Sequence, residues 1–211
     1  MPLTDPFQKL PGEKKQRIIR AALKEFADKG YEQASTNRIV KEAGIGKGML
    51  FYYFNSKQDL YQYLIDYSFE IVKEHYLNRV DDSIEDVIDR LGHVARIKFE
   101  FLVRFPEVTL FLGRFILEVE QEWPEPFKKK YEEIYALLQE RLYRQKRIDR
   151  SKFRDDVDPD KACQLIEWAM KGYEQDLREA FRGKKLSEVD LTPYWQEFDE
   201  YLAVLKTCFY K

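Results

Sequence analysis

The chain has few of the residues on which disulfide-bonded, metal-binding and catalytic domains depend. Its two cysteines, Cys163 and Cys208, are far apart and form no C-x-x-C pair, so neither a disulfide framework nor a zinc site of that type is expected. Its two histidines supply no H-E-x-x-H motif and no nucleophile–histidine–acid set. We therefore expect no metal, no cofactor and no enzymatic activity.

Long hydrophobic runs are also missing. The most apolar window, residues 101–117, is interrupted by Arg104, Glu107 and Arg114, which makes it too short and too charged for a membrane span. The first residues, M-P-L-T-D-P-F, have no basic patch followed by an apolar run, so no secretory signal is predicted. We expect a cytoplasmic protein without membrane association, in which both thiols stay reduced.

Alternating runs of β-branched residues do not occur, whereas apolar residues recur at spacings of three and four. This periodicity is typical of helices. The 211 residues, of which 44% are hydrophobic and 35% charged, are enough for a sizeable core. We predict an all-α fold, with a three-helix domain over residues 1–55 and a larger helical domain over residues 56–211.

The most informative stretch is residues 36–57, T-N-R-I-V-K-E-A-G-I-G-K-G-M-L-F-Y-Y-F-N-S-K. Two short helical patterns lie on either side of Gly44, a residue that tolerates the left-handed conformation in which many helices end. Their inward-facing apolar residues are Ile39, Val40, Ala43, Leu50 and Phe54. An amphipathic helix over residues 13–30, ended by Gly30, precedes them. Together they predict a helix-turn-helix bundle.

Three patterns in this region keep their order and spacing: A-A-L-x-x-F-x-x-x-G-Y over residues 21–31, T-x-x-I-V-x-x-A-G-I from Thr36, and K-G-x-L-F-x-Y-F-x-S-K from Lys47. They resemble the N-terminal DNA-binding domain of the TetR family of bacterial transcriptional regulators. Phe51 stands where that family usually has tyrosine, and Gly46 where it has serine or threonine. The resemblance implies a ligand-responsive regulator, a repressor with activation left open, that binds a palindromic DNA operator as a homodimer.

Chemistry and the resemblance indicate the same DNA contacts. Lys47 can reach guanine edges or phosphates, and Gly48 lets the backbone come close to the bases. Thr36 is expected to cap its helix and to hold a phosphate with the free amides there. Met49 and Tyr52 are expected to make apolar contacts with thymine methyl groups. The hydroxyls of Tyr52 and Tyr53 are expected to bind phosphates. Lys57 resembles the family's lysine at the start of the next helix, which binds the DNA backbone. The expected DNA-binding residues are Thr36, Asn37, Arg38, Lys47, Gly48, Met49, Tyr52, Tyr53 and Lys57.

Charge is unevenly distributed along the chain. Residues 1–60 carry 11 Lys+Arg against 7 Asp+Glu, whereas residues 61–211 carry 25 against 31. The first segment therefore has a net charge of +4 and the second of −6, within a total of −2. Because the positive charge is concentrated where the motif lies, this distribution favours double-stranded DNA as a partner.

Only helices are expected beyond residue 55. Ser56 is predicted to cap a helix that reaches about residue 76, and Ser83 to open a second that ends before Pro106. A third helix runs to about residue 120. After the W-P-E-P turn at residues 123–126, a fourth reaches about residue 146, and a charged loop follows to residue 156.

The two last helices open at the pairs Asp158–Pro159 and Thr192–Pro193, which are typical of a helix cap and first turn. Each helix carries a broad apolar face. These faces comprise Leu165, Ala169, Gly172 and Tyr173 on the first helix and Phe198, Tyr201, Leu202 and Leu205 on the second. They suit either a four-helix dimer interface or the chain's own core. The resemblance to the family favours the dimer.

Aromatic residues make up 15% of the chain, and several lie in the larger domain. The candidates for a ligand site are Phe99, Phe105, Phe111, Phe115, Trp123, Tyr135 and Trp168. Such a set suits the wall of an apolar cavity or the filling of a helical core. The resemblance implies a small-molecule effector in this domain. His75, on the apolar side of the connecting helix, is either a core histidine or a polar ligand anchor.

The competing interpretation is an all-helical ligand-binding or scaffold protein whose three-helix head contacts another protein. Salt dependence separates the two, because phosphate contacts weaken steeply as the salt concentration rises. We take DNA binding as the leading hypothesis.

Overall fold

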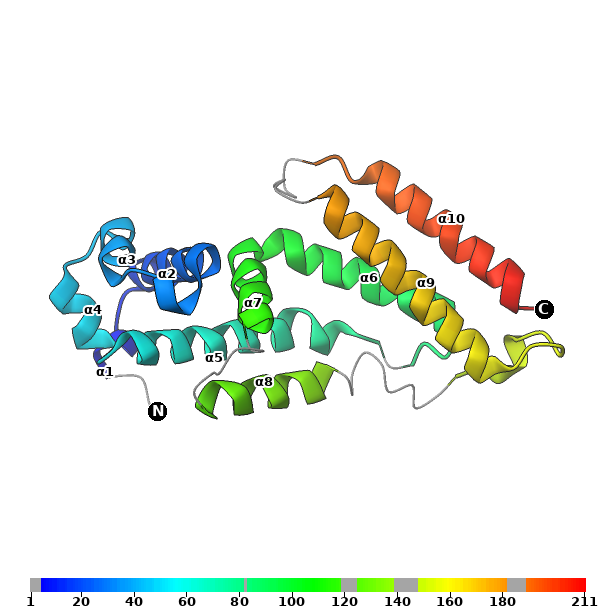
Figure 1. The fold of residues 1–211 in the computed structure, drawn as a ribbon, viewed down its shortest axis with the longest axis horizontal. Coiled ribbons are helices and arrows are strands. Elements are labelled where there is room, and N and C mark those ends of the chain that lie inside the picture. Colours follow the sequence, from blue (N-terminus) through cyan, green and yellow to red (C-terminus); the bar gives the residue numbers. More distant parts are fainter. Residues whose placement is uncertain (1–4, 82, 119–124, 139–147, 182–188) are drawn as a thin grey trace. The chain divides into compact units, whose positions relative to one another are not determined.

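A computed structural model describes residues 5–81, 83–118, 125–138, 148–181 and 189–211 (Figure 1). The regular structure in these ranges is helical, apart from one antiparallel bridge between Phe153 and Tyr210, which confirms the predicted all-α fold. The helices form two compact units, Met1–Leu77 with Arg104–Gln139 and Asn78–Val103 with Glu140–Lys211. The boundary at residue 55 stays a prediction. No helix in the described ranges is long and apolar enough to cross a membrane.

The first unit contains α1 (Asp5–Gln8), α2 (Gly12–Gln33), α3 (Thr36–Ala43), α4 (Lys47–Tyr53), α5 (Lys57–His75), α7 (Pro106–Glu118) and α8 (Glu125–Leu138). The end predicted for α8, near residue 146, lies outside the described residues. Gly30 interrupts the helical conformation of α2 with a φ of 69°, and Gly44 ends α3 with a φ of 64°. Because this region of backbone conformation favours glycine, both predicted stops are confirmed. Ser56 caps α5 as predicted, by accepting a hydrogen bond of 3.0 Å from the Asp59 N–H.

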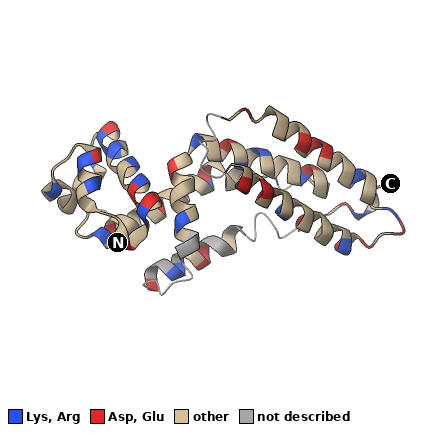
Figure 2. Cartoon of the chain, turned by 45° about the horizontal axis from the view of Figure 1, so that its top comes forward, with Lys and Arg blue, Asp and Glu red and all other residues tan. Residues whose placement is uncertain are grey.

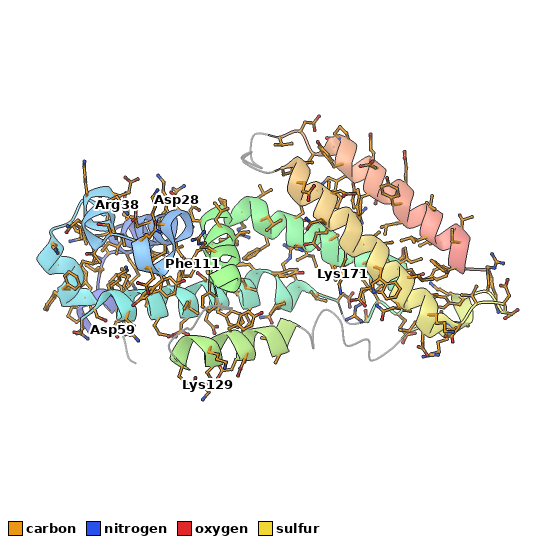
Figure 3. The ribbon with its side chains drawn as sticks, viewed as in Figure 1. Asp28, Arg38, Asp59, Phe111, Lys129 and Lys171 are labelled. Carbon is orange, nitrogen blue, oxygen red and sulfur yellow. The ribbon has the colours of Figure 1, made fainter. Side chains whose placement is uncertain are left out.

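The core of the first unit is rich in aromatic rings. Tyr61 of α5, which is 1% exposed, lies 4.8 Å from Phe26 of α2 and 5.3 Å from Phe111 of α7, measured between ring centroids. Phe115, one turn further along α7, lies 6.4 Å from Tyr61. Figure 3 shows Phe111 where α7 meets its neighbours. Burial of each such ring contributes about 1.5–3 kcal/mol, so α7 is firmly joined to both α2 and α5.

The second unit is built from α6 (Val87–Arg104), a short 3-10 helix (Arg150–Lys152), α9 (Pro159–Ala180) and α10 (Thr192–Phe209). Its core cluster consists of Val87, Ile88, Phe153, Ala162, Ile166, Phe198 and Leu202. Gly92 of α6 allows α10 to approach closely, because a Cβ placed there would lie 3.0 Å from Leu202 Cδ1.

The start of α6 differs from the prediction. The helix begins at Val87 rather than at Ser83. The Asp86 carboxylate accepts hydrogen bonds of 2.9 and 3.0 Å from the N–H groups of Ile88 and Asp89. This aspartate therefore satisfies the free donors of the first turn and takes the role expected of the serine.

The two last helices start where predicted, but only one uses the predicted cap. Asp158 accepts hydrogen bonds of 2.9 and 3.3 Å from the N–H groups of Asp160 and Lys161, which confirms the cap of α9. At α10 the carboxylate of Asp190 accepts the Thr192 N–H at 3.0 Å, and the cap position makes no side-chain cap bond. The capping role predicted for Thr192 is therefore wrong.

Candidate nucleic-acid interface

The short helix α4 is buried on one side and open on the other. Leu50 is 1% exposed and Phe54, which follows the helix, is 4% exposed. The residues on the open side are Lys47, Gly48, Met49 and Tyr52. Met49 is 39% and Tyr52 58% exposed. A Cβ placed at Gly48 would meet no atom within 4 Å, so the backbone there is accessible to a large partner.

Tyr53 does not lie on this open side. Its side chain is 3% exposed, and its ring centroid lies 5.7 Å from that of Phe7 in α1. The expected surface position of Tyr53 is therefore wrong, because it shares a face with Leu50 three residues earlier. Phe7 is completely buried and also contacts Phe54 at 4.6 Å and Tyr63 at 5.3 Å. Sequence reasoning missed Phe7, since α1 is too short to show a periodic pattern.

The start of α3 is organised around the carboxylate of Glu25, a residue of α2. Glu25 Oε1 accepts the Ser35 N–H at 2.8 Å and Arg38 Nη2 at 2.5 Å, while Arg38 Nε donates to Oε2 at 3.0 Å. Arg38 Nη2 also donates to the Gln33 carbonyl at 3.1 Å. The hydrogen bonds from Arg38 hold the pKa of the Glu25 carboxyl below its usual value. Arg38, expected on DNA, is thus engaged within the protein.

Two other expected contacts lie beside this ion pair. Thr36 is half-buried and is the first residue of α3, whereas Ser35 occupies the cap position without a side-chain cap bond. The capping role predicted for Thr36 is therefore wrong. Asn37 is exposed. Figure 3 labels Arg38 on α3.

Lys57 joins the start of α5 to the end of α2. Its ammonium donates to the Glu32 carbonyl at 3.1 Å and lies 5.0 Å from the ring centroid of Tyr31. A lysine at the end of a helix satisfies a free carbonyl there and interacts favourably with the helix dipole.

Charged residues of both signs occur throughout the helices near the N-terminus (Figure 2). Two cations of this region, Arg38 and Lys24, form ion pairs with Glu25 and Glu42 at 2.5 and 3.7 Å. Lys47 makes no ion pair within the described residues. It is therefore the exposed cation of α4 whose charge is available to an anionic partner.

The aromatic residues expected at a ligand site are divided between the two units. Phe105, Phe111 and Phe115 belong to the first unit, Phe99 and Trp168 to the second, and Trp123 and the Tyr135 side chain lie outside the described residues. Phe111 and Phe115 are each 1% exposed in the core. Phe105 stacks on His75 with 4.8 Å between centroids, and Phe99 contacts Trp195 at 5.3 Å. Trp168 is 60% exposed, so the cavity-wall position expected for it is wrong.

The apolar residues of α9 and α10 are divided between an inner and an outer face. Phe198 and Leu202 are buried in the chain's own core, and the half-buried Tyr173 and Leu205 pack against that core. The expectation that Phe198 and Leu202 contact a partner is therefore wrong. The outer face, which we call the α9–α10 apolar face, comprises the exposed residues Leu165, Trp168, Ala169, Gly172, Tyr201 and Val204.

Comparisons with known proteins agree with a helix-turn-helix DNA-binding domain at the N-terminus. Residues 18–64 match the family model described as "Bacterial regulatory proteins, tetR family". The chain is 36% identical over 93 residues to an HTH-type transcriptional regulator of Staphylococcus aureus. That match covers 44% of this chain and 48% of the relative, so the chain spans about half the length of the curated relatives it matches.

Solved structures extend the similarity over the rest of the fold. A TetR family transcriptional regulator from Chloroflexus aurantiacus has a TM-score of 0.68 at 24% identity and covers 99% of both chains. The fatty acid degradation regulator FadR from Bacillus halodurans has a TM-score of 0.53 at 25% identity, over 89% of this chain and 96% of that one. The class is thus that of helix-turn-helix regulators. Residues 18–64 thus match the helix-turn-helix domain of the TetR family, and the fold of the chain is similar to that of solved TetR family regulators.

Proposed function

We propose that the protein is a ligand-responsive repressor that binds a palindromic DNA operator as a homodimer and is released by an apolar small molecule. The observation that carries this proposal is the open side of α4, where Lys47, Gly48, Met49 and Tyr52 are all exposed. A cation, an accessible backbone and two large side chains on one helix suit the donor and methyl pattern of a major groove. The buried residues of α4 keep this side turned outward.

Phosphate contacts complete the proposed interface. Asn37, Thr36 and the amides at the start of α3 would bind the DNA backbone, as would Lys57 at the start of α5. Such contacts fix register without reading sequence. Arg38 takes part by holding the start of α3 against Glu25 of α2.

The α9–α10 apolar face supports the homodimer. Leu165 is 48%, Tyr201 44% and Val204 55% exposed, which leaves several large apolar side chains in water on neighbouring helices. The exposed Ala169 and Gly172 between them are small enough for a partner helix to come close. A two-fold dimer would place two copies of α4 at half-sites about 34–36 Å apart, one turn of DNA.

The effector is the third part of the proposal. The name of the B. halodurans neighbour refers to fatty acid degradation, and we extend only the apolar character of such compounds to this chain. Because α7 packs on both α2 and α5, a molecule that moves α7 would also move the helices that carry α4. The molecule needs to prefer the DNA-incompetent arrangement by only a few kcal/mol.

The decisive experiment measures binding to duplexes selected from a random pool by fluorescence anisotropy. Lys47→Ala combined with Tyr52→Ala is expected to abolish specific binding while leaving helicity unchanged. Glu42→Gln, on the exposed surface of α3, serves as the control substitution. Wild-type affinity should fall steeply between about 50 and 200 mM salt. An affinity for the duplex that does not change with salt concentration, or that is unchanged by the double substitution, would instead indicate that the three-helix head binds a protein partner.

A further inference from the structure

Ser68 lies in the middle of α5. Among the described residues of the first unit, it is the one buried residue with a polar, non-aromatic side chain. It is 0% exposed, and its hydroxyl oxygen has no hydrogen-bond partner among the described residues. A buried hydroxyl without a partner costs about 1–3 kcal/mol. Such groups are rare in folded proteins and call for a specific explanation.

Other helical hydroxyls in the molecule show how this cost is usually avoided. Thr109 donates to the Phe105 carbonyl and Thr207 to the Ala203 carbonyl, four residues earlier in each helix, both at 3.0 Å. Ser68 makes no corresponding bond to its own helix. The cost of burying the Ser68 hydroxyl is therefore not offset by a hydrogen bond to the backbone of α5.

The face of α5 that carries Ser68 has an aromatic residue on either side. Positions seven residues apart share a face, so Tyr61 and His75 each lie about 10 Å from Ser68 along the helix axis. The ring contacts along this stripe are Tyr61–Phe115 at 6.4 Å, Phe115–Tyr131 at 6.3 Å and His75–Phe105 at 4.8 Å. They involve α5, α7, α8 and Phe105, the residue that precedes α7. Ser68 is thus a buried hydroxyl without a hydrogen-bond partner among the described residues, on an elongated face of α5 that is lined by aromatic rings.

The geometry points to a binding site on this stripe for an uncharged, elongated apolar molecule with one hydrogen-bonding oxygen, which Ser68 contacts. The inference rests on the proposed function, because it specifies the class of the effector. No lysine or arginine is buried among the described residues of the first unit. A carboxylate or phosphate at the depth of Ser68 would lack a countercharge, and burying an unpaired charge is far more costly than burying an alcohol or ketone.

The test uses the full chain and two probes of equal chain length, dodecan-1-ol and dodecanoate, both below their aggregation concentrations. Isothermal titration should show tighter binding of dodecan-1-ol. Ser68→Ala is expected to weaken that binding about three- to tenfold, the range for one hydrogen bond, and to raise the melting temperature of the free protein. Thr207→Val, which removes a hydroxyl already bonded to its own helix, is the matched control and should leave binding unchanged.

The two effects of Ser68→Ala have opposite signs, which separates a ligand contact from a structural one. A lower melting temperature would mean that the hydroxyl has a partner within the protein, and would overturn the inference. So would failure of the wild type to bind dodecan-1-ol, or equal binding by the wild type and Ser68→Ala. If dodecan-1-ol binds through Ser68 yet leaves operator affinity unchanged, the site stands and the effector part of the proposed function fails.

Discussion

Arg38 of α3 and Glu25 of α2 form a bidentate ion pair, in which Nη2 lies 2.5 Å from Oε1 and Nε lies 3.0 Å from Oε2. Because the Ser35 N–H donates to the same carboxylate, Glu25 also satisfies a free donor at the start of α3. The side chain of Glu25 is 11% exposed and that of Arg38 53%. The pair therefore fixes the start of α3 against α2, which makes Arg38 a positioning residue in the proposed DNA interface.

Removing either member of this pair should have the same effect on DNA binding. We expect Arg38→Ala and Glu25→Gln each to weaken operator binding about fivefold, or roughly 1 kcal/mol, and the double variant to be no worse than either single one. Fluorescence anisotropy with one selected duplex provides the measurement. If Arg38 instead contacts phosphate directly, Glu25→Gln would retain or increase affinity while Arg38→Ala lowers it.

The same pair predicts a pH dependence of stability. Hydrogen bonds from Arg38 lower the pKa of Glu25 from its usual 4.5. The stabilisation is thus fully present above pH 4.5 and is lost as the pH falls through the lowered pKa. At pH 7 we expect Glu25→Gln to reduce the free energy of unfolding by about 1.5 kcal/mol. Thermal melts from pH 7 to pH 3 should show this difference disappearing, and a difference that persists at pH 3 would contradict the assignment.

Phe7 is expected to be essential to the position of α4. Its ring is completely buried and contacts Tyr53 and Phe54, which lie at the end of that helix. Phe7→Ala should lower the free energy of unfolding of the first unit by about 3–5 kcal/mol, the usual cost of deleting a buried aromatic side chain. Phe7→Leu should restore most of the loss, and the exposed neighbour Gln8→Ala should have no effect. Denaturant unfolding followed by circular dichroism is the measurement.

Asp86 is expected to be the most sensitive polar residue of the second unit. Burial alone would raise its pKa, but hydrogen bonds from Lys152 at 2.7 Å, from the backbone and from the Tyr210 hydroxyl at 3.0 Å lower it overall. Asp86→Ala should cost about 3 kcal/mol because it leaves several donors unpaired, whereas Tyr210→Phe should cost only about 1 kcal/mol. Chemical denaturation of both variants at pH 7 tests this order.

The α9–α10 apolar face is expected to be required for self-association. Leu165→Glu should yield a monomer of unchanged helicity, because a charge in an apolar interface loses its hydration. Gln164→Glu places a charge on the preceding exposed residue of the same helix and should leave the dimer intact. Light scattering coupled to size exclusion gives the molecular mass. Identical masses for Leu165→Glu and wild type would contradict the assignment of this face.

Local chemistry made much of the fold predictable. Gly44 and the pair Asp158–Pro159 act within one turn of their own position, so sequence alone was sufficient to place two helix boundaries. Prediction failed where a distant or competing residue took the role. Asp86 and Asp190 supply the hydrogen-bond acceptors expected of Ser83 and Thr192, because a carboxylate accepts more strongly than a hydroxyl.

The site shows the same division between local and long-range determinants. Exposure of Lys47, Met49 and Tyr52 follows from the period of one helix. The burial of Tyr53 depends on Phe7, 46 positions earlier, and the engagement of Arg38 depends on a carboxylate of the preceding helix. The spacing of residues around the motif predicts neither Phe7 nor Glu25 as a partner, because a contact between separate helices has no sequence period.

The ring of Tyr61 has a mechanical consequence. It contacts the rings of Phe26, Phe111 and Phe115, so α7 is packed directly against α2 and α5. A displacement of α7 is therefore expected to rotate the three-helix domain as a rigid body and not to unfold it. Amide protons of α2 and α3 should therefore exchange with solvent equally slowly in the DNA-bound and released forms, with regulation visible only as a change of orientation.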